Sequence, residues 1–304
     1  MRIEVKEDSN PSLARIIIAG KWTGDVNTTK QLLQEVCDKW PKGKKVDCLI
    51  TCGAFLNFDW PQSLTDVGDN KYPNETALNL LISEAKRQCD LLIDEELRKR
   101  LLACTEYITI GIDSYKDKIS LSDVSIKELH VELVALIDLK TKQYFWTGKS
   151  YPTTGQENGL VRFQDLSTHF LELPFGKVMI LGCHDLKMFD PRVYKRANIR
   201  HWRQEILDEF HKVAKNEKPT LLLHHPHETD CVEGIKITNG KYSPGTWDRA
   251  WGDVKKIIPT VEKYAGAGRY YNSENPYYER SKLNDVLGKT KLGDTIDFVV
   301  NIWK

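Results

Sequence analysis

Residues 170–185, FLELPFGKVMILGCHD, decide how the rest of the chain is interpreted. Residues 178–181 form an apolar run that is too short for an ordinary helix and typical of a fully buried strand, with Gly176 before it and Gly182 at its end. Cys183 therefore stands where a buried strand opens into a loop. In open α/β sheets, ligands bind beside loops at the carboxyl ends of strands. A cysteine there can act as a nucleophile, although most single cysteines are buried and unreactive.

The composition bounds the class of protein. The chain of 304 residues is long enough for one large α/β domain or two ordinary ones. Its 44 basic and 43 acidic residues leave a net charge of +1. This argues against an overall positive potential that would attract nucleic acids or membrane surfaces. The first ten residues have no apolar signal-peptide core, and no apolar run is long enough to cross a bilayer. The seven cysteines include no CxxC pair, so we expect reduced thiols and a cytoplasmic protein.

Strands alternate with helices along the chain. Short apolar runs predict strands at residues 14–20, 46–52, 107–112, 132–139, 143–147, 169–173, 177–181, 220–223 and 295–303. Helical spacing of apolar residues predicts helices at about 28–40, 200–215 and 247–264, and one or two helices over about 75–104. This order predicts an α/β fold with a mostly parallel sheet, helices on its outer face, and antiparallel strands from the hairpin at 132–147.

Three motifs in this order resemble the nitrilase, or carbon–nitrogen hydrolase, superfamily. They are GDVN at 24–27, the hairpin ELVALIDL and QYFWTGK at 132–139 and 143–149, and FLELPFGKVMILGCHDL at 170–186. The resemblance covers nearly the whole chain. It implies an α-β-β-α sandwich as a single domain over residues 1–304, with a variable tail from about 265. It also implies a homo-oligomer formed through the outer helices.

Enzymes of that superfamily use a Glu-Lys-Cys triad. By motif, the resemblance makes Cys183 the nucleophile and Lys149 the lysine. A thiol with an ordinary pKa near ~8.5 is mostly protonated at neutral pH, and a neighbouring ammonium favours the thiolate. The lysine can also stabilise an oxyanion, for which the backbone N–H of His184 would be a second donor.

The glutamate of the triad is missing at its expected place. The stretch after the second strand is CGAF at 52–55, with Ala54 where the resemblance implies glutamate. Three explanations remain open: an engineered or trapped form, a pseudoenzyme, or a base supplied by another group. Glu157, in the loop after Lys149, is the leading substitute and His184 is another. The persistence of Lys149, Cys183 and Asp185 favours the engineered form.

Histidines follow the predicted strand at 220–223. We hypothesise that His224, His225 or His227 contacts substrate, with help from Arg192 for an anionic group. A polar turn that caps a buried strand is the simpler interpretation for any one of them. With His184 and Asp185, these histidines also look faintly like the strand ends of metallophosphoesterases. That interpretation lacks an Asp-x-His on the first strand and ranks second.

Three functions follow from these patterns. The first is a thiol-dependent hydrolase that cleaves a non-peptide C–N bond of an amide, nitrile or carbamoyl compound through a covalent intermediate on Cys183. It would need a small-molecule substrate and no cofactor, nucleic acid or membrane. The second is a catalytically silent module of the same fold for binding or assembly. The third is a metal-dependent phosphoesterase.

Overall fold

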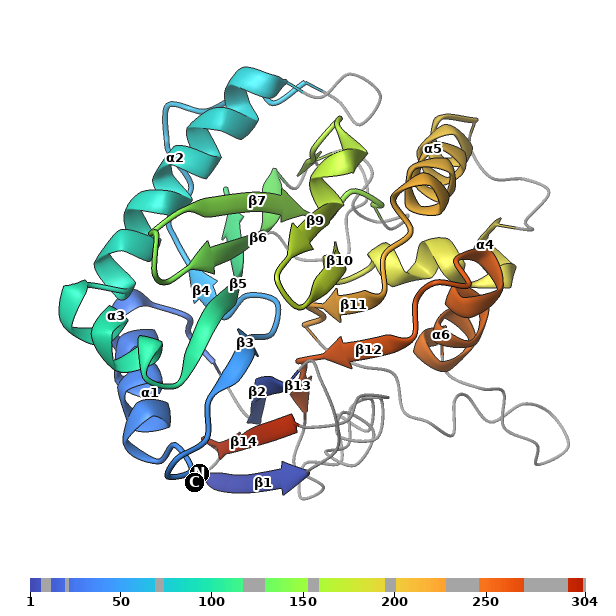
Figure 1. Ribbon diagram of the computed structural model, residues 1–304. Helices are drawn as coiled ribbons and strands as arrows, with labels where there is room; N and C mark the ends of the chain where they lie inside the picture. Colours follow the sequence, from blue (N-terminus) through green and yellow to red (C-terminus); the bar gives the residue numbers. More distant parts are fainter. Residues whose placement is uncertain are drawn as a thin grey trace, which may run out of the picture.

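Two β-sheets lie between two groups of helices in the computed structural model of the chain (Figure 1). The structure describes residues 1–6, 12–19, 22–68, 74–116, 129–152, 159–194, 201–227, 246–270 and 295–302. Within this part of the chain, no helix is both long and apolar enough to span a membrane.

The larger sheet combines parallel and antiparallel strands. Its strand order is β1 (Arg2–Lys6), β14 (Thr295–Asn301), β2 (Leu13–Ala19), β3 (Val46–Ile50), β5 (Thr105–Tyr115), β6 (His130–Asp138) and β7 (Tyr144–Gly148). Strands β14, β2, β3 and β5 pair in parallel, whereas β5, β6 and β7 form an antiparallel meander. Short strands β4 (Leu56–Asn57), β8 (Leu160–Val161) and β13 (Arg269–Tyr270) pair with β5, β6 and β2.

The smaller sheet has the strand order β12 (Lys263–Gly266), β11 (Leu221–His224), β10 (Gly176–Leu181) and β9 (Phe170–Leu173). Strands β10, β11 and β12 run parallel, so their carboxyl ends meet at one edge. Strand β9 joins β10 as an antiparallel hairpin. The loop that carries the candidate nucleophile begins at the carboxyl end of β10.

Helices cover the outer face of each sheet. On the larger sheet these are α1 (Val26–Asp38), α2 (Glu75–Leu92) and α3 (Glu95–Leu102), which share one apolar cluster with it. Each begins at a side-chain cap, namely Asp25, Asn74 and Asp94, which accepts a backbone N–H of the first turn. On the smaller sheet, α5 (His201–Glu217) and α6 (Thr246–Ile257) share a second cluster with β10 and β11. The short α4 (Pro191–Tyr194) follows the 3₁₀ turn Asp185–Phe189.

The inner faces of the two sheets share a third apolar cluster. It contains Val134 and Leu136 of β6 together with Ile180 of β10 and Leu223 of β11. Side chains of a strand alternate between its two faces, so every second residue of β6 points into this space. The α-β-β-α sandwich expected from the sequence is therefore confirmed.

The structure corrects several predicted boundaries. Strand β1 was not predicted. The helix predicted for 247–264 ends at Ile257, and residues 263–266 form the edge strand β12. The strand predicted at 295–303 is β14 and ends at Asn301; it lies between β1 and β2 inside the larger sheet. The sequence AGAG at 265–268 concealed β12, since glycine is disfavoured within strands.

Candidate active site

A row of polar side chains crosses the larger sheet at one end of the space between the sheets. In β5, Ile108, Ile110 and Ile112 face the helices, so Asp113 faces the smaller sheet. Asp113 stands opposite Glu132 of β6 in the antiparallel register. The backbone N–H of Lys149, just after β7, donates to the Glu132 carbonyl oxygen at 2.8 Å. Three neighbouring strands thus bring two carboxylates and an ammonium together.

Lys149 and Glu132 form a buried ion pair. The Lys149 Nζ lies 2.6 Å from Glu132 Oε1, and the two residues are only 1% and 5% exposed. Burial acts to raise the pKa of Glu132, but the nearby Lys149, His227 and His130 outweigh it and lower that pKa to about 2. Glu132 is therefore an ionised carboxylate at neutral pH, held against the lysine in a water-poor site.

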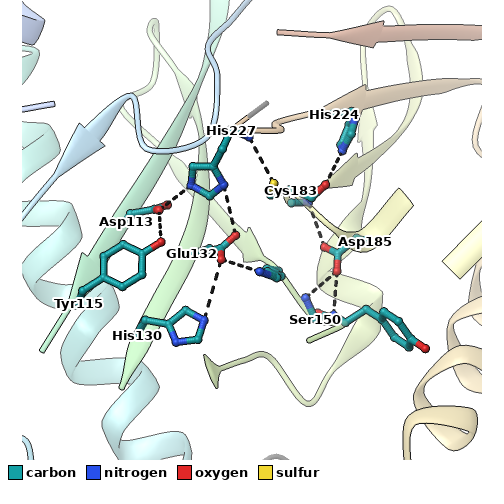
Figure 2. Close-up of polar contacts among 12 residues, drawn as sticks. Asp113, Tyr115, His130, Glu132, Ser150, Cys183, Asp185, His224 and His227 are labelled. Atoms are coloured by element: carbon teal, nitrogen blue, oxygen red, sulfur yellow. Dashed lines mark hydrogen bonds and ion pairs between the residues drawn. The ribbon is translucent and has the colours of Figure 1, made fainter. Parts of the chain in front are cut away.

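Cys183 lies next to this pair. A carboxylate oxygen of Glu132, the sulfur of Cys183 and a ring nitrogen of His227 all lie within 4.8 Å of one another. Figure 2 shows the three side chains pointing toward a common point from β6, from the loop after β10 and from the loop after β11. Burial would raise the pKa of the Cys183 thiol, but the imidazoles of His184 and His227 hold it well below its ordinary value.

Backbone contacts fix the cysteine loop against the lysine. The buried carboxylate of Asp185 accepts hydrogen bonds from the backbone N–H groups of Ser150, Tyr151 and Gly182 at 2.9, 2.8 and 3.0 Å (Figure 2). A Cβ at Gly182 would come within 2.8 Å of the backbone of Lys149, so only glycine permits this approach. Asp185 thereby joins the loop after β7 to the loop after β10.

Two of the three predicted histidines are used inside the protein. His224 Nε2 donates to the carbonyl oxygen of Cys183 at 2.9 Å, and its Nδ1 lies 2.9 Å from the Tyr264 hydroxyl. His225 Nδ1 donates to the Thr51 carbonyl oxygen at 2.7 Å. Both imidazoles are buried. Burial lowers the pKa of His225 to about 4, so this ring is neutral near pH 7.

A cavity of about 550 Å³ opens beside the site. Its walls come from the start of α1, the loop around β4, the end of β5 and α2, and include Ala54, Asp113, Tyr115 and His227. Of the three predicted histidines, His227 is the one that lines this cavity. Cys183 is not part of its wall; His227 connects the two, because its backbone N–H donates to the cysteine sulfur at 3.3 Å.

The other predicted site residues have separate positions. Ala54 lines the cavity and has a left-handed backbone with φ of 50°. His184 follows Cys183 and acts on its thiol through charge and a hydrogen bond. Arg192 binds Asp190 at 2.9 Å and does not line the cavity. Glu157 lies outside the described residues.

Sequence interpretation missed Glu132 and Asp113. Each had a signal: Glu132 is a carboxylate between valine and leucine in the strand HVELVALID, and Asp113 continues the alternation ITIGID on its polar side. An unpaired charge is costly inside a sheet, so a buried strand that carries one indicates a partner or a site. The partner itself depends on the strand register, which the sequence did not supply.

Glu132, Cys183 and His227 have donor types that zinc accepts. However, the Lys149 ammonium already binds the Glu132 carboxylate at 2.6 Å, and a second cation there would meet its repulsion. Two of the residues expected for a phosphoesterase are also engaged, since Asp185 accepts three backbone N–H groups and both ring nitrogens of His224 are bonded. These residues do not fit that third function.

Comparison with family models finds no match, and comparison with curated proteins finds none either. Solved structures with a similar fold include a carbon–nitrogen hydrolase from Helicobacter pylori G27, at 12% identity over 97% of this chain and 80% of that one, with a TM-score of 0.41. An amidase from Nesterenkonia sp. has 9% identity over 87% and 78%, with a TM-score of 0.39. An N-terminal amidase has 14% identity over 84% and 55%, with a TM-score of 0.38. At these low values, the chemistry of this protein has to be inferred from its own residues.

Proposed function

We propose that this protein is a thiol hydrolase of a non-peptide C–N bond, with Cys183 as nucleophile, Lys149 as oxyanion donor and Glu132 as base. One observation carries the proposal: the buried Lys149–Glu132 pair, 2.6 Å between its charged atoms, with the Cys183 sulfur within 4.8 Å of the carboxylate. A nucleophile, a cation and a carboxylate in one water-poor place are the groups that acyl transfer through a thiol requires.

The reaction follows from these positions. The Cys183 thiolate attacks the carbon of an amide or nitrile, and negative charge develops on the substrate heteroatom. The Lys149 ammonium stabilises that charge strongly because the site excludes water. After the amine or ammonia leaves, the Glu132 carboxylate accepts a proton from water, which attacks the thioester and releases the acid.

In this proposal Glu132 replaces the carboxylate that the resemblance implies at residue 54. The carboxylate comes from β6 instead of the loop after β3, yet it reaches the same lysine. Ala54 is then part of the cavity wall, with no proton to accept. A base is present in the chain, so the explanations by a trapped form or a pseudoenzyme are not needed.

Intact mass spectrometry tests the proposal. The chain is mixed with a panel of aliphatic amides, nitriles and carbamoyl compounds, and adducts are mapped to single cysteines. Glu132→Gln should accumulate an acyl adduct on Cys183, because attack remains and water is no longer activated. Cys183→Ala should form none. Cys89→Ala is the matched control, since that thiol is buried in the helix-covered core.

The outcomes separate the alternatives. The hydrolase is supported if the adduct is lost in Cys183→Ala and if turnover is lost in Glu132→Gln. An adduct that forms equally in Cys183→Ala would refute it. If no compound of the panel reacts with the chain or with Glu132→Gln, the catalytically silent binding module becomes the better interpretation.

A further inference from the structure

His227 occupies the centre of the charged site (Figure 2). Its Nε2 lies 2.6 Å from Asp113 Oδ2, and its Nδ1 lies 3.8 Å from Glu132 Oε2. A ring nitrogen is within 4.8 Å of the Cys183 sulfur, to which the His227 backbone N–H donates. The residue is 18% exposed and lines the cavity. It therefore lies between the nucleophile and the space that a substrate would enter.

The surroundings of His227 favour its protonated form. Burial alone would lower the pKa of the imidazole, but Asp113, Cys183 and Glu132 raise it well above its ordinary value. Asp113 can only accept a hydrogen bond, so Nε2 carries a hydrogen toward it. With Nε2 occupied, Nδ1 is the nitrogen that exchanges a proton with groups near Glu132 and Cys183.

We propose that His227 is a catalytic residue that holds the proton lost by the Cys183 thiol and delivers it to the departing nitrogen. Asp113 is the positioning residue that fixes the imidazole. The inference rests on the proposed function, because a departing nitrogen presupposes C–N cleavage. It assigns the proton-transfer role to a histidine, while Lys149 and Glu132 keep the roles given above.

The bonds and protons balance in this step. The thiolate sulfur forms a bond to the substrate carbon, and the π pair moves to the oxygen beside Lys149. When that pair returns, the C–N bond breaks and its electrons stay on nitrogen. The nitrogen takes the proton from His227 Nδ1 and leaves as a neutral amine, so the imidazole becomes neutral. Water that later attacks the thioester gives up a proton to Glu132, and the Cys183 thiolate is released when the acid leaves. The proton then passes from Glu132 to His227, which restores the thiolate, the imidazolium and the carboxylate.

Other titratable groups face His227 and enter the pH dependence. Tyr115 donates to Asp113 Oδ2 at 2.9 Å; burial and the neighbouring carboxylates raise its pKa, so it stays neutral. Asp113 from β5, Glu132 from β6 and Cys183 after β10 act on the imidazole directly. Tyr115 from β5, His130 from β6, Lys149 from the end of β7 and His184 after β10 act on these three groups in turn. His227 contacts both Asp113, through its ring, and the Cys183 sulfur, through its backbone N–H.

Alkylation of Cys183 tests the proton assignment without any substrate. Iodoacetamide reacts with thiolates, and peptide mapping reports Cys183 separately from the other cysteines. In the unaltered chain, the rate should stay high down to acidic pH. In His227→Gln the midpoint should move upward by about one pH unit or more, because the thiolate loses its imidazolium. His211→Gln is the matched control, since that ring binds the Met188 carbonyl at 3.0 Å.

A leaving-group comparison tests the second half of the proposal. A p-nitrophenyl ester needs no protonation of its leaving group, whereas an anilide does. His227→Gln should slow anilide cleavage by about 10²-fold or more relative to the ester. Asp113→Asn should move the alkylation midpoint in the same direction by a smaller amount, and Asp113→Glu should restore part of it. If His227→Gln folds poorly, the two Asp113 variants still test the role of His227 through the alkylation midpoint.

The results distinguish the two proposals. An unchanged alkylation midpoint in both His227→Gln and Asp113→Asn overturns the role of His227, whatever the activity. Equal losses for ester and anilide overturn its role as proton donor. If instead the midpoint moves but no acyl adduct ever forms on Cys183, the proposed hydrolase function fails while the thiolate–imidazolium pair stands.

Discussion

The two ends of the space between the sheets are built from the same strands, but one is lined by apolar side chains and the other by charged side chains. In β6, Leu136 and Val134 belong to the apolar cluster between the sheets, and Glu132, two residues further along the same face, belongs to the charged site. Residues i and i+2 of a strand share a face. Val134 and Glu132 are therefore direct neighbours on one face of β6, and the apolar cluster gives way to the charged site between them. The packing of the apolar residues of β6 therefore also fixes the position of Glu132 in the charged site.

Removing one charge should have the largest effect on stability. Glu132→Gln leaves the buried Lys149 ammonium without its carboxylate, which should lower the free energy of unfolding by about 3–5 kcal/mol. The double variant Glu132→Gln with Lys149→Met should recover most of this loss, because no buried charge remains. Urea unfolding of the two single variants and the double variant measures the coupling. Additive losses would show that the pair is not coupled.

Damage at the apolar end should lower stability almost as much and leave the chemistry intact. Leu136→Ala removes a fully buried side chain and should cost about 3 kcal/mol through the cavity that it leaves. The pH midpoint of Cys183 alkylation should not move, because no charge near the sulfur changes. A shifted midpoint in Leu136→Ala would mean that the two ends are not independent.

Acid should destabilise the charged end in two separate stages. The pKa of His225 is about 4 in the folded chain and near 6.5 when unfolded, so its contribution is present above pH 6.5 and is lost as pH falls toward 4. The pKa of Glu132 falls from 4.5 to about 2, so its contribution is lost between those values. His225→Gln should remove up to about 3 kcal/mol of the first stage only. Unfolding measured across pH checks this, and Leu136→Ala should keep both stages.

Ala54 should give the smallest change. Ala54→Gly removes the backbone strain of a left-handed alanine, which favours the folded chain. Glycine also raises the entropy of the unfolded chain, which favours unfolding. Because the two effects oppose each other, the free energy of unfolding should change by less than about 1 kcal/mol. Ala54→Glu should not raise C–N hydrolase activity if Glu132 is the base, because it only adds a second carboxylate to the cavity that Asp113 lines. A large gain in turnover with Ala54→Glu would return the base to residue 54.

Local sequence patterns predicted the layers of the fold and two residues of the candidate site. The apolar runs gave β10 and β11, and the motifs led to Cys183 and Lys149. They could not give Glu132, because its relation to Lys149 depends on the pairing of β6 with β7 and of β5 with β6. The same patterns could not separate His227 from His224 and His225. The three rings differ in their partners: His224 and His225 bind backbone carbonyls, whereas His227 binds the Asp113 carboxylate. These partners come from other strands and loops and cannot be identified from the local sequence.

The three hydrogen bonds accepted by Asp185 have a mechanical consequence. Its carboxylate spans the seam between the two sheets, with the lysine on one side and the cysteine on the other. Any sliding of one sheet over the other would stretch these bonds and change the distance between Lys149 and Cys183. Asp185 thus sets the distance between the two loops, and a shorter or longer side chain at this position should slow the proposed reaction by changing that distance, although Lys149 and Cys183 are both retained.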